Sequence, residues 1–585
     1  MALPCRVIDR SYMWRVSLVV LLLLAGWGGL AARLGHLHLG SNTALQDRVR
    51  RMRRIRQDLH VGRGRILDRN GNLLALDLTT QNIVVSPETV ISNRQVREVS
   101  RHLARVLELP AEQVLDRVNR PGRQYEAIVR RAPEEVAERV ERLQLRGVRF
   151  EPVSSRHYPQ KELACHVIGF SNLEGDGSAG IEQRWDSLLK GRDGFRLSEK
   201  DGRRREVYTR RSLEVAPQEG ANIHLTLDQN IQYFTEKALD AALTNFHPQA
   251  AWAIVQEVRT GAILAMASRP AFDLNDYSRT TPAIRMNRAI AFNFEPGSVF
   301  KVGVVAAAIN EGLVATNDVF DCEMGLWYYG GRPLRDYSPH GLMDVTGVLR
   351  KSSNIGTAKI ALLLGDERLY RYLKAFGVGK ATGIGLPGEE AGLLHSPSRW
   401  SKISATRIAM GHEVAVTALQ MLNIMSCIGN DGFLMRPYLV SRVVDRNGAI
   451  LQETHPEAVA RPITERTAAL MRSMLIETTR EGGTGTRAAV PGYTVAGKTG
   501  TAEKIEDGRY VRNQNIASFI GMLPAERPEI AIIVVLDNPQ PVRTGGATAG
   551  PVFAQIAAPA ARYLDIRPVD AAELVYYHRM IEGAP

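Results

Sequence analysis

The clearest hydrophobic pattern in the chain lies near its N-terminus. Residues 16–32 read VSLVVLLLLAGWGGLAA, and Arg15 and Arg33 stand on either side of this uncharged stretch. At about 1.5 Å per residue, a helix of this length just crosses the hydrocarbon core of a membrane. The hydrophobic part of a cleaved signal peptide is usually shorter. The pattern therefore predicts an uncleaved transmembrane helix over 16–33, preceded by a cytoplasmic tail over 1–15.

The distribution of arginines bears on the orientation of this helix. Arg6, Arg10 and Arg15 favour a cytoplasmic N-terminus by the positive-inside rule. A second group of arginines, between residues 48 and 56, follows the helix, but large domains cross membranes largely regardless of charge. We expect a short tail inside and about 550 residues outside.

The region after the anchor, residues 34–221, is rich in arginine and mixes short alternating and helical patterns. The turn signal Asp-Arg-Asn-Gly at 68–71 separates two short apolar alternations. Residues 93–108 and 133–145 have the spacing of amphipathic helices. Because this region shows no obvious nucleophile or ligand cluster, we predict a structural or interaction domain, a pedestal.

A second domain is predicted over 222–585. Residues 223–227 alternate like a strand, and a helix capped by Asp228 follows. Two apolar runs, 251–258 and 262–267, surround a turn and are typical of a hairpin.

The rest of this domain is predicted to be helical in the middle and to return to strands at the end. Residues 298–312 and 406–428 have helical patterns, 517–522 and 530–536 are strand-like, and a last helix runs from Pro551 to about 563. This order predicts an α+β fold, in which an antiparallel sheet is assembled from both ends of the domain with helices on both faces.

Composition supports a globular protein with anionic surroundings. The 585 residues are 44% hydrophobic and 23% charged, which excludes disorder, collagen and coiled coils for the bulk of the chain. The net charge of +12 suits a membrane surface or a polyanionic polymer and does not demand nucleic acid. The four cysteines contain no CxxC pair, which excludes a disulfide framework and a zinc ribbon. Pairing of Cys322 with Cys427 stays open, although free buried thiols are favoured.

The first chemistry-bearing motif is Glu-Pro-Gly-Ser-Val-Phe-Lys at 295–301. Pro and Gly break the chain before a helix, so Ser298 and Lys301 share one face of its first turn. A serine hydroxyl needs a base to become a nucleophile, and a desolvated lysine can be neutral enough to serve. By itself, the motif more commonly marks an N-cap serine followed by a solvated lysine.

The second motif is Ser352-Ser353-Asn354, directly before a helical run over 357–364. Its ordinary meaning is a helix N-cap. Its functional meaning is a second hydroxyl that relays a proton, with an amide that holds a substrate carbonyl.

The third motif, Lys-Thr-Gly-Thr at 498–501, has two interpretations. Residues 492–499 match the phosphate-binding pattern GxxxxGK[ST], which would indicate an ATPase. However, Tyr-Thr-Val-Ala in the loop positions favours a strand. On an edge strand Lys498 offers a cation, Thr499 and Thr501 offer hydroxyls, and Gly500 lets a substrate backbone approach.

Together the three motifs are specific. SxN lies 54 residues after Ser298 and KTG 200 residues after it, in the order known from penicillin-binding proteins and class A β-lactamases. The pair His412-Glu413 begins like the zinc motif HExxH, but residue 416 is Val, so no metal is predicted.

The whole chain resembles the class B penicillin-binding proteins, most closely the division-specific peptidoglycan D,D-transpeptidases of the FtsI or penicillin-binding protein 3 type. The stretches that carry the resemblance are 63–71, 166–170, 180–182, 294–298, 350–356 and 411–417.

This resemblance implies a serine acyl-enzyme mechanism on stem peptides that end in D-alanyl-D-alanine. It implies Ser298 as nucleophile, Lys301 as its base and Ser352 as proton relay to the leaving amine. It implies backbone N–H groups of Ser298 and Thr501 as the oxyanion hole. The substrate-binding residues that it implies are Asn354, Lys498, Thr499, Gly500 and Thr501.

The resemblance also implies the surroundings of the enzyme. It implies a single-pass protein of the inner membrane with a periplasmic catalytic domain, and no cofactor. The implied partners are stem peptides on lipid-linked nascent glycan, a SEDS-type glycosyltransferase, other division proteins, and β-lactams as covalent inhibitors; no nucleic acid is implied. The alternatives are an elongation-specific paralogue and a division scaffold with secondary catalysis, with a β-lactamase or a P-loop ATPase less favoured.

Overall fold

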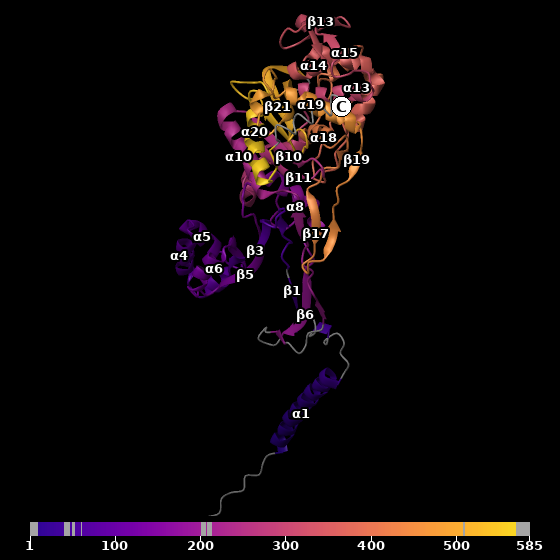
Figure 1. Cartoon of the computed structure of the whole chain (residues 1–585). Coiled ribbons are helices and arrows are strands. Elements are labelled where there is room, and N and C mark those ends of the chain that lie inside the picture. Colours follow the sequence, from indigo (N-terminus) through magenta and orange to yellow (C-terminus); the bar gives the residue numbers. More distant parts are fainter. Residues whose placement is uncertain are drawn as a thin grey trace, which may run out of the picture. The chain divides into compact units, whose positions relative to one another are not determined.

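The computed structural model describes residues 10–39, 47–48, 53–59, 61–200, 206–207, 213–506 and 509–568 (Figure 1). By their internal contacts they form two compact units, 1–60 with 193–218 and 61–192 with 219–585.

The first unit contains the N-terminal helix and a small sheet. Helix α1 (Arg10–Leu39) includes a 27-residue stretch with a mean hydropathy of 1.9, none of it buried, which is long and apolar enough to cross a membrane. The predicted apolar helix is confirmed and extends beyond 16–33 at both ends. The sheet pairs β1 (Arg54–Leu59) with β6 (Gly194–Lys200), which also pairs with β7 (Glu206–Val207) and β8 (Leu213–Val215).

The second unit begins with a seven-stranded sheet in the order β18-β17-β9-β2-β3-β4, with β5 beside β3. Strand β9 was expected to open the catalytic domain. It pairs in parallel with β2, Ile66 opposite Ile223, so strands from before and after residue 222 share one sheet. The strand bounds are β2 Ile66–Leu67, β3 Leu73–Val85, β4 Glu126–Ala132, β5 Val148–His157, β9 Asn222–Leu225, β17 Val440–Val444 and β18 Ile450–Glu453.

The predicted local elements of residues 61–192 are confirmed with shorter bounds. The turn at 68–71 joins β2 to β3. Helices α4 (Val96–Leu107) and α6 (Glu134–Glu141) lie inside the ranges expected for them. The remaining helices of this part are α3 Pro87–Ser92, α5 Ala111–Val118, α7 Cys165–Ile168, α8 Gly180–Arg184 and α9 Asp186–Leu189.

A buried ion network ties this part together. The carboxylate of Glu182 on α8 accepts hydrogen bonds from Arg63 Nε at 2.5 Å and from Arg156 Nε at 2.6 Å. Arg156 also pairs with Asp77 on β3 at 3.0 Å. Since the Glu182 side chain is fully buried, its two guanidinium partners supply the compensation that a buried charge requires.

The catalytic sheet is antiparallel throughout, in the order β11-β10-β22-β21-β20. As predicted, it draws strands from both ends of the domain, and β20 lies at an edge. Its strands are β10 Ala250–Glu257, β11 Ile263–Arg269, β20 Ala496–Glu506, β21 Arg509–Leu523 and β22 Ile530–Asp537.

Helices cover both faces of this sheet, as predicted. Side chains along β10 alternate between two hydrophobic cores: Trp252 and Ile254 belong to one, and Ala251 and Ala253 to the other. Helices α10 (Gln229–Phe246) and α20 (Ala549–Tyr563) pack into the second core, whereas α13 (Lys301–Asn310) and α18 (Ala418–Gly429) pack into the first (Figure 1). The predicted cap is also present, because the Asp228 carboxylate accepts the first N–H groups of α10.

The helix predicted over 406–428 is wrong in its first half. Helix α17 (Ser404–Ile408) ends early, and α18 begins only after a loop, at a capping box formed by Thr417. In this loop Gly411 has φ +80°, and a Cβ there would lie 2.3 Å from the carbonyl oxygen of Gly297. The loop therefore packs directly on the residue before Ser298, which a continuous helix would not allow.

Shorter elements complete this part of the chain. The helices are α11 Pro282–Arg285, α12 Arg288–Ala291, α14 Val345–Lys351, α15 Asn354–Leu364, α16 Asp366–Ala375 and α19 Glu465–Glu477. The strands are β12 Val319–Asp321, β13 Leu326–Tyr329, β14 Arg332–Arg335, β15 Leu342–Asp344, β16 Leu434–Met435 and β19 Ala458–Ala460.

Candidate active site

The predicted nucleophile lies in a 3-10 turn, η3 (Gly297–Phe300), that leads into α13. Ser298 is half-buried in this turn. Lys301, one turn later, is completely buried. The structure thus places a partly accessible hydroxyl one helical turn from an amine that water does not reach.

The SxN motif lies where α14 ends and α15 begins. Ser352 adopts a left-handed backbone conformation with φ 61°, which terminates α14. Ser353 then caps α15, because its hydroxyl oxygen accepts the N–H of Gly356 at 2.9 Å. The predicted cap is confirmed, and the helix begins three residues earlier than expected, at Asn354.

Lys301 links the first two motifs. Its Nζ donates to the Ser352 carbonyl oxygen at 2.6 Å and to Asn354 Oδ1 at 2.7 Å, and lies 3.3 Å from Ser352 Oγ. The Nδ2 group of Asn354 donates to the carbonyl oxygen of Arg335 at 2.8 Å, so both ends of this amide are held.

Lys498, in the third motif, lies on the edge strand β20 and contacts the second motif. Its Nζ donates to Ser352 Oγ at 2.9 Å and to the Thr499 carbonyl oxygen at 3.2 Å. The P-loop interpretation is wrong, since residues 496–506 form a strand and no helix opens at Lys498. Lys301 and Lys498, which lie far apart in the sequence, therefore meet at one serine hydroxyl.

Burial dominates the electrostatics of the two lysines. Desolvation lowers the pKa of Lys301 to about 7, although the Asp336 carboxylate opposes this shift. Desolvation, and then repulsion from Lys301, lowers the pKa of Lys498 well below its ordinary value. Because burial lowers its pKa to about 7, a substantial fraction of Lys301 is neutral near neutral pH, as a base must be.

Asp336 is a functional residue that the sequence did not reveal. Its Oδ2 accepts a hydrogen bond from Ser353 Oγ at 2.6 Å. Its Oδ1 accepts hydrogen bonds from the backbone N–H groups of Asn354 and Ile355 at 2.5 and 3.0 Å. A carboxylate at a helix N-terminus satisfies otherwise unpaired N–H groups. No local pattern marks it, because it reaches α15 from the loop after β14.

Gly500 lets β20 approach the nucleophile turn. A Cβ at Gly500 would lie 2.3 Å from Ser518 Oγ, 3.0 Å from Val299 Cγ1 and 3.1 Å from the Pro296 carbonyl oxygen. We expected this glycine to admit a substrate backbone. The structure shows a tight contact with the enzyme's own chain as well.

The two threonines of the third motif have different surroundings. Thr499 is buried, with Oγ1 2.9 Å from Oγ1 of Thr484. Thr501 is exposed, and its Oγ1 accepts the N–H of Gly545 at 3.1 Å. Both hydroxyls are therefore oriented by neighbouring residues.

The three cysteines in the described part of the chain are free and buried, so Cys322 and Cys427 do not pair. Cys322 lies beside the second motif, with its sulfur 3.3 Å from Ser353 Oγ.

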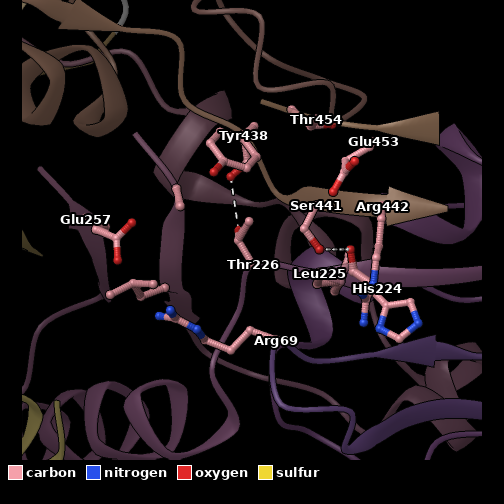
Figure 2. Close-up of a pocket in the computed structure, with 12 residues that line it drawn as sticks. Arg69, His224, Leu225, Thr226, Glu257, Tyr438, Ser441, Arg442, Glu453 and Thr454 are labelled. Carbon is pink, nitrogen blue, oxygen red and sulfur yellow. Dashed lines mark hydrogen bonds between the residues drawn. The ribbon is translucent and has the colours of Figure 1, made fainter. Parts of the chain in front are cut away.

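Two hollows in the surface differ in their distance from the motifs. One of about 310 Å³ lies beside the nucleophile turn and is lined by Glu295, Leu393, Trp400, Ile408, Val414 and Ile505, among others. The other, of about 340 Å³, contains none of the predicted site residues (Figure 2). There Thr226 and Ser441 donate to the carbonyl oxygens of Tyr438 and His224 at 3.1 and 2.9 Å, so these hydroxyls serve the fold (Figure 2).

A serine on a helical turn, two buried lysines and an SxN turn, set against the edge of an antiparallel sheet, define a penicillin-interacting serine acyltransferase. The penicillin-binding protein transpeptidase domain matches residues 251–558, and the penicillin-binding protein dimerisation domain matches 58–225. The chain belongs to the class B penicillin-binding proteins, as a D,D-transpeptidase of the FtsI, PenA and penicillin-binding protein 3 type.

Curated relatives are similar over nearly their whole length. The probable peptidoglycan D,D-transpeptidase PenA of Neisseria meningitidis is 33% identical, over 95% of this chain and 93% of its own. The peptidoglycan D,D-transpeptidase FtsI of Escherichia coli is 32% identical, over 95% and 92%. Stage V sporulation protein D of Bacillus subtilis is 33% identical, over 86% and 79%.

Comparison with solved structures supports the same family. Penicillin-binding protein 3 of Mycobacterium tuberculosis, complexed with aztreonam, has a TM-score of 0.70 and 29% identity, covering 88% of this chain and 98% of that one. The chain is thus a serine-type peptidoglycan D,D-transpeptidase and a β-lactam target, and the family resemblance predicted from its motifs is confirmed.

Proposed function

We propose that this transpeptidase cross-links stem peptides during septal cell-wall synthesis, with Ser298 as its nucleophile. The observation that carries the residue assignment is the meeting of Lys301 and Lys498 at the hydroxyl of Ser352. A serine, a neutral amine and a relay hydroxyl are the groups that acyl transfer requires.

In acylation, Ser298 Oγ attacks the carbonyl carbon between the two terminal D-alanines. Its proton passes to neutral Lys301. Ser352 delivers a proton to the leaving nitrogen as the C–N bond breaks and D-alanine departs, and Lys301 passes the proton it has received to Ser352, which restores both groups. Backbone N–H groups of Ser298 and Thr501 hold the developing oxyanion, a role worth about 3 kcal/mol per donor in other acyl-transfer enzymes.

In the second half-reaction, an amine of a neighbouring stem peptide attacks the ester carbonyl. The amine proton leaves through the Ser352 and Lys301 groups, the C–O bond breaks, and the proton returns to Ser298 Oγ. The products are the cross-linked peptide and the free enzyme.

Substrate binding falls to Asn354, Lys498, Thr499, Gly500 and Thr501. A bound substrate carboxylate favours the protonated form of Lys498. The resulting positive charge keeps Lys301 neutral, so substrate binding itself prepares the base.

The septal role and its setting complete the proposal. We assign 34–221 as pedestal and 222–585 as transpeptidase domain, a division supported by family matches over 58–225 and 251–558. Residues 16–33 anchor the chain in the inner membrane, with 1–15 cytoplasmic and the catalytic domain periplasmic, which the N-terminal arginines support. A SEDS-type glycosyltransferase and other division proteins would be its partners.

Intact mass after incubation with a penicillin tests the site. We expect one stable adduct on the full chain in detergent and none on Ser298→Ala. Rapid loss of the adduct with drug turnover would instead indicate a β-lactamase, and no adduct on folded protein would overturn the assignment.

Depletion of the protein in its own bacterium tests the septal role. We expect filamentous cells and a fluorescent fusion that gathers at the septum. Rounded cells would support the elongation-specific paralogue, and rescue by Ser298→Ala would support a division scaffold.

A further inference from the structure

The loop at 481–485, between α19 and the next 3-10 turn, spans the gap between the second and third motifs. On one side, Lys351 Nζ donates to the Gly482 carbonyl oxygen at 2.8 Å. On the other, a Cβ at Gly546 would lie 2.3 Å from the Thr484 carbonyl oxygen, so the chain presses closely on the loop. The backbone position of Thr484 is therefore set from both sides.

The hydroxyl of Thr484 lies at the part of the site where the proposed function places the substrate carboxylate. Thr484 is exposed, and its Oγ1 is 2.9 Å from Oγ1 of buried Thr499. Each hydroxyl carries one proton, so whichever of the two donates within the pair, one proton remains for another acceptor. Thr501 also keeps its proton, because its oxygen accepts the Gly545 N–H.

We propose that Thr484 is a further substrate-binding residue, which completes a set of three threonine hydroxyls around the terminal carboxylate of the stem peptide. The inference rests on the proposed function, because Lys498, Thr499 and Thr501 must already form the carboxylate site. A carboxylate only accepts hydrogen bonds, and bonds to it are about twice as strong as bonds between neutral groups. The third hydroxyl therefore favours substrates that end in a free carboxylate.

Two acyl donors test this proposal on the full chain in detergent: an acyl-D-alanyl thioester with a free terminal carboxylate, and its methyl ester. The readout is the second-order acylation rate constant. We expect Thr484→Val to lower the rate with the carboxylate donor about tenfold, as loss of one hydrogen bond to a charged group does, and to leave the ester within about twofold. Thr484→Ser keeps the hydroxyl and should retain the wild-type preference.

Thr486→Val is the matched control, because Thr486 is exposed in the adjoining turn and should leave both rates unchanged. An equal fall with both donors would show a structural role and overturn the proposal, as would no fall with either. Failure of the proposed function itself looks different: the wild-type protein would then be acylated by neither donor.

Discussion

Lys301 and Lys498 both direct their Nζ atoms at the hydroxyl of Ser352, at 3.3 and 2.9 Å. Because both lysines are fully buried and adjacent, holding two positive charges there is unfavourable. Ser352 Oγ is thus the atom through which Lys301, the proposed base, and Lys498, the proposed carboxylate-binding residue, influence each other. The pH dependence of the reaction should report this relationship.

The acylation rate should rise with pH through about 7, because Lys301 acts as base only when neutral and burial lowers its pKa to about 7. Below that pH we expect about a tenfold loss of rate per pH unit, and a plateau above it. Stopped-flow acylation by a penicillin between pH 5 and 9 measures the profile. A flat profile across this range would contradict the assignment of Lys301 as base.

Removing the charge of Asp336 should move that profile toward lower pH. Asp336 raises the pKa of Lys301 against the effect of burial, so Asp336→Asn should lower the midpoint. Since the same carboxylate caps α15, we also expect a stability loss of about 1 kcal/mol. Asp321→Asn, at an exposed position on β12, serves as control, and an unchanged midpoint for Asp336→Asn would refute the coupling.

Gly500→Ala should reduce acylation by at least about tenfold without a change of charge. The added Cβ would lie 2.3 Å from Ser518 Oγ, so β20 must move away from the nucleophile turn. Adding Ser518→Ala removes that oxygen and should restore part of the rate. Acylation kinetics of the single and double variants decide this, and a double variant as slow as the single one would argue against the clash.

Glu182→Gln should destabilise the protein by about 3–5 kcal/mol, because Arg63 and Arg156 would keep buried charges without their shared carboxylate. Thermal unfolding of the full chain measures the effect. Glu138→Gln removes an exposed ion pair with Arg142 and should cost at most about 0.5 kcal/mol. Equal shifts for the two variants would show that burial of Glu182 has little energetic weight.

The catalytic sheet could be predicted because both of its faces are covered. Residues 251–255 and 530–536 are continuous apolar runs, which is what strands buried on both sides require. The register and sheet of β9 could not be predicted, since a four-residue alternation does not specify its neighbours. The break in the helix predicted over 406–428 was also hidden, because its cause, the contact of Gly411 with Gly297, joins segments far apart in the chain.

The same contrast between what the sequence predicts and what tertiary structure decides holds for the candidate site. Local signals placed Ser298, Lys301, Ser352 and Lys498 on turns, caps and strands, but it was the order and spacing of the three motifs, and the family they resemble, that singled these residues out. Tertiary structure alone decided that Lys301 is desolvated, that Lys498 shares its contact with Ser352, and that Asp336 and Thr484 contact residues of the second and third motifs. Protonation and hydrogen bonding depend on distances between segments that meet only when the chain is folded, and no local pattern encodes those distances.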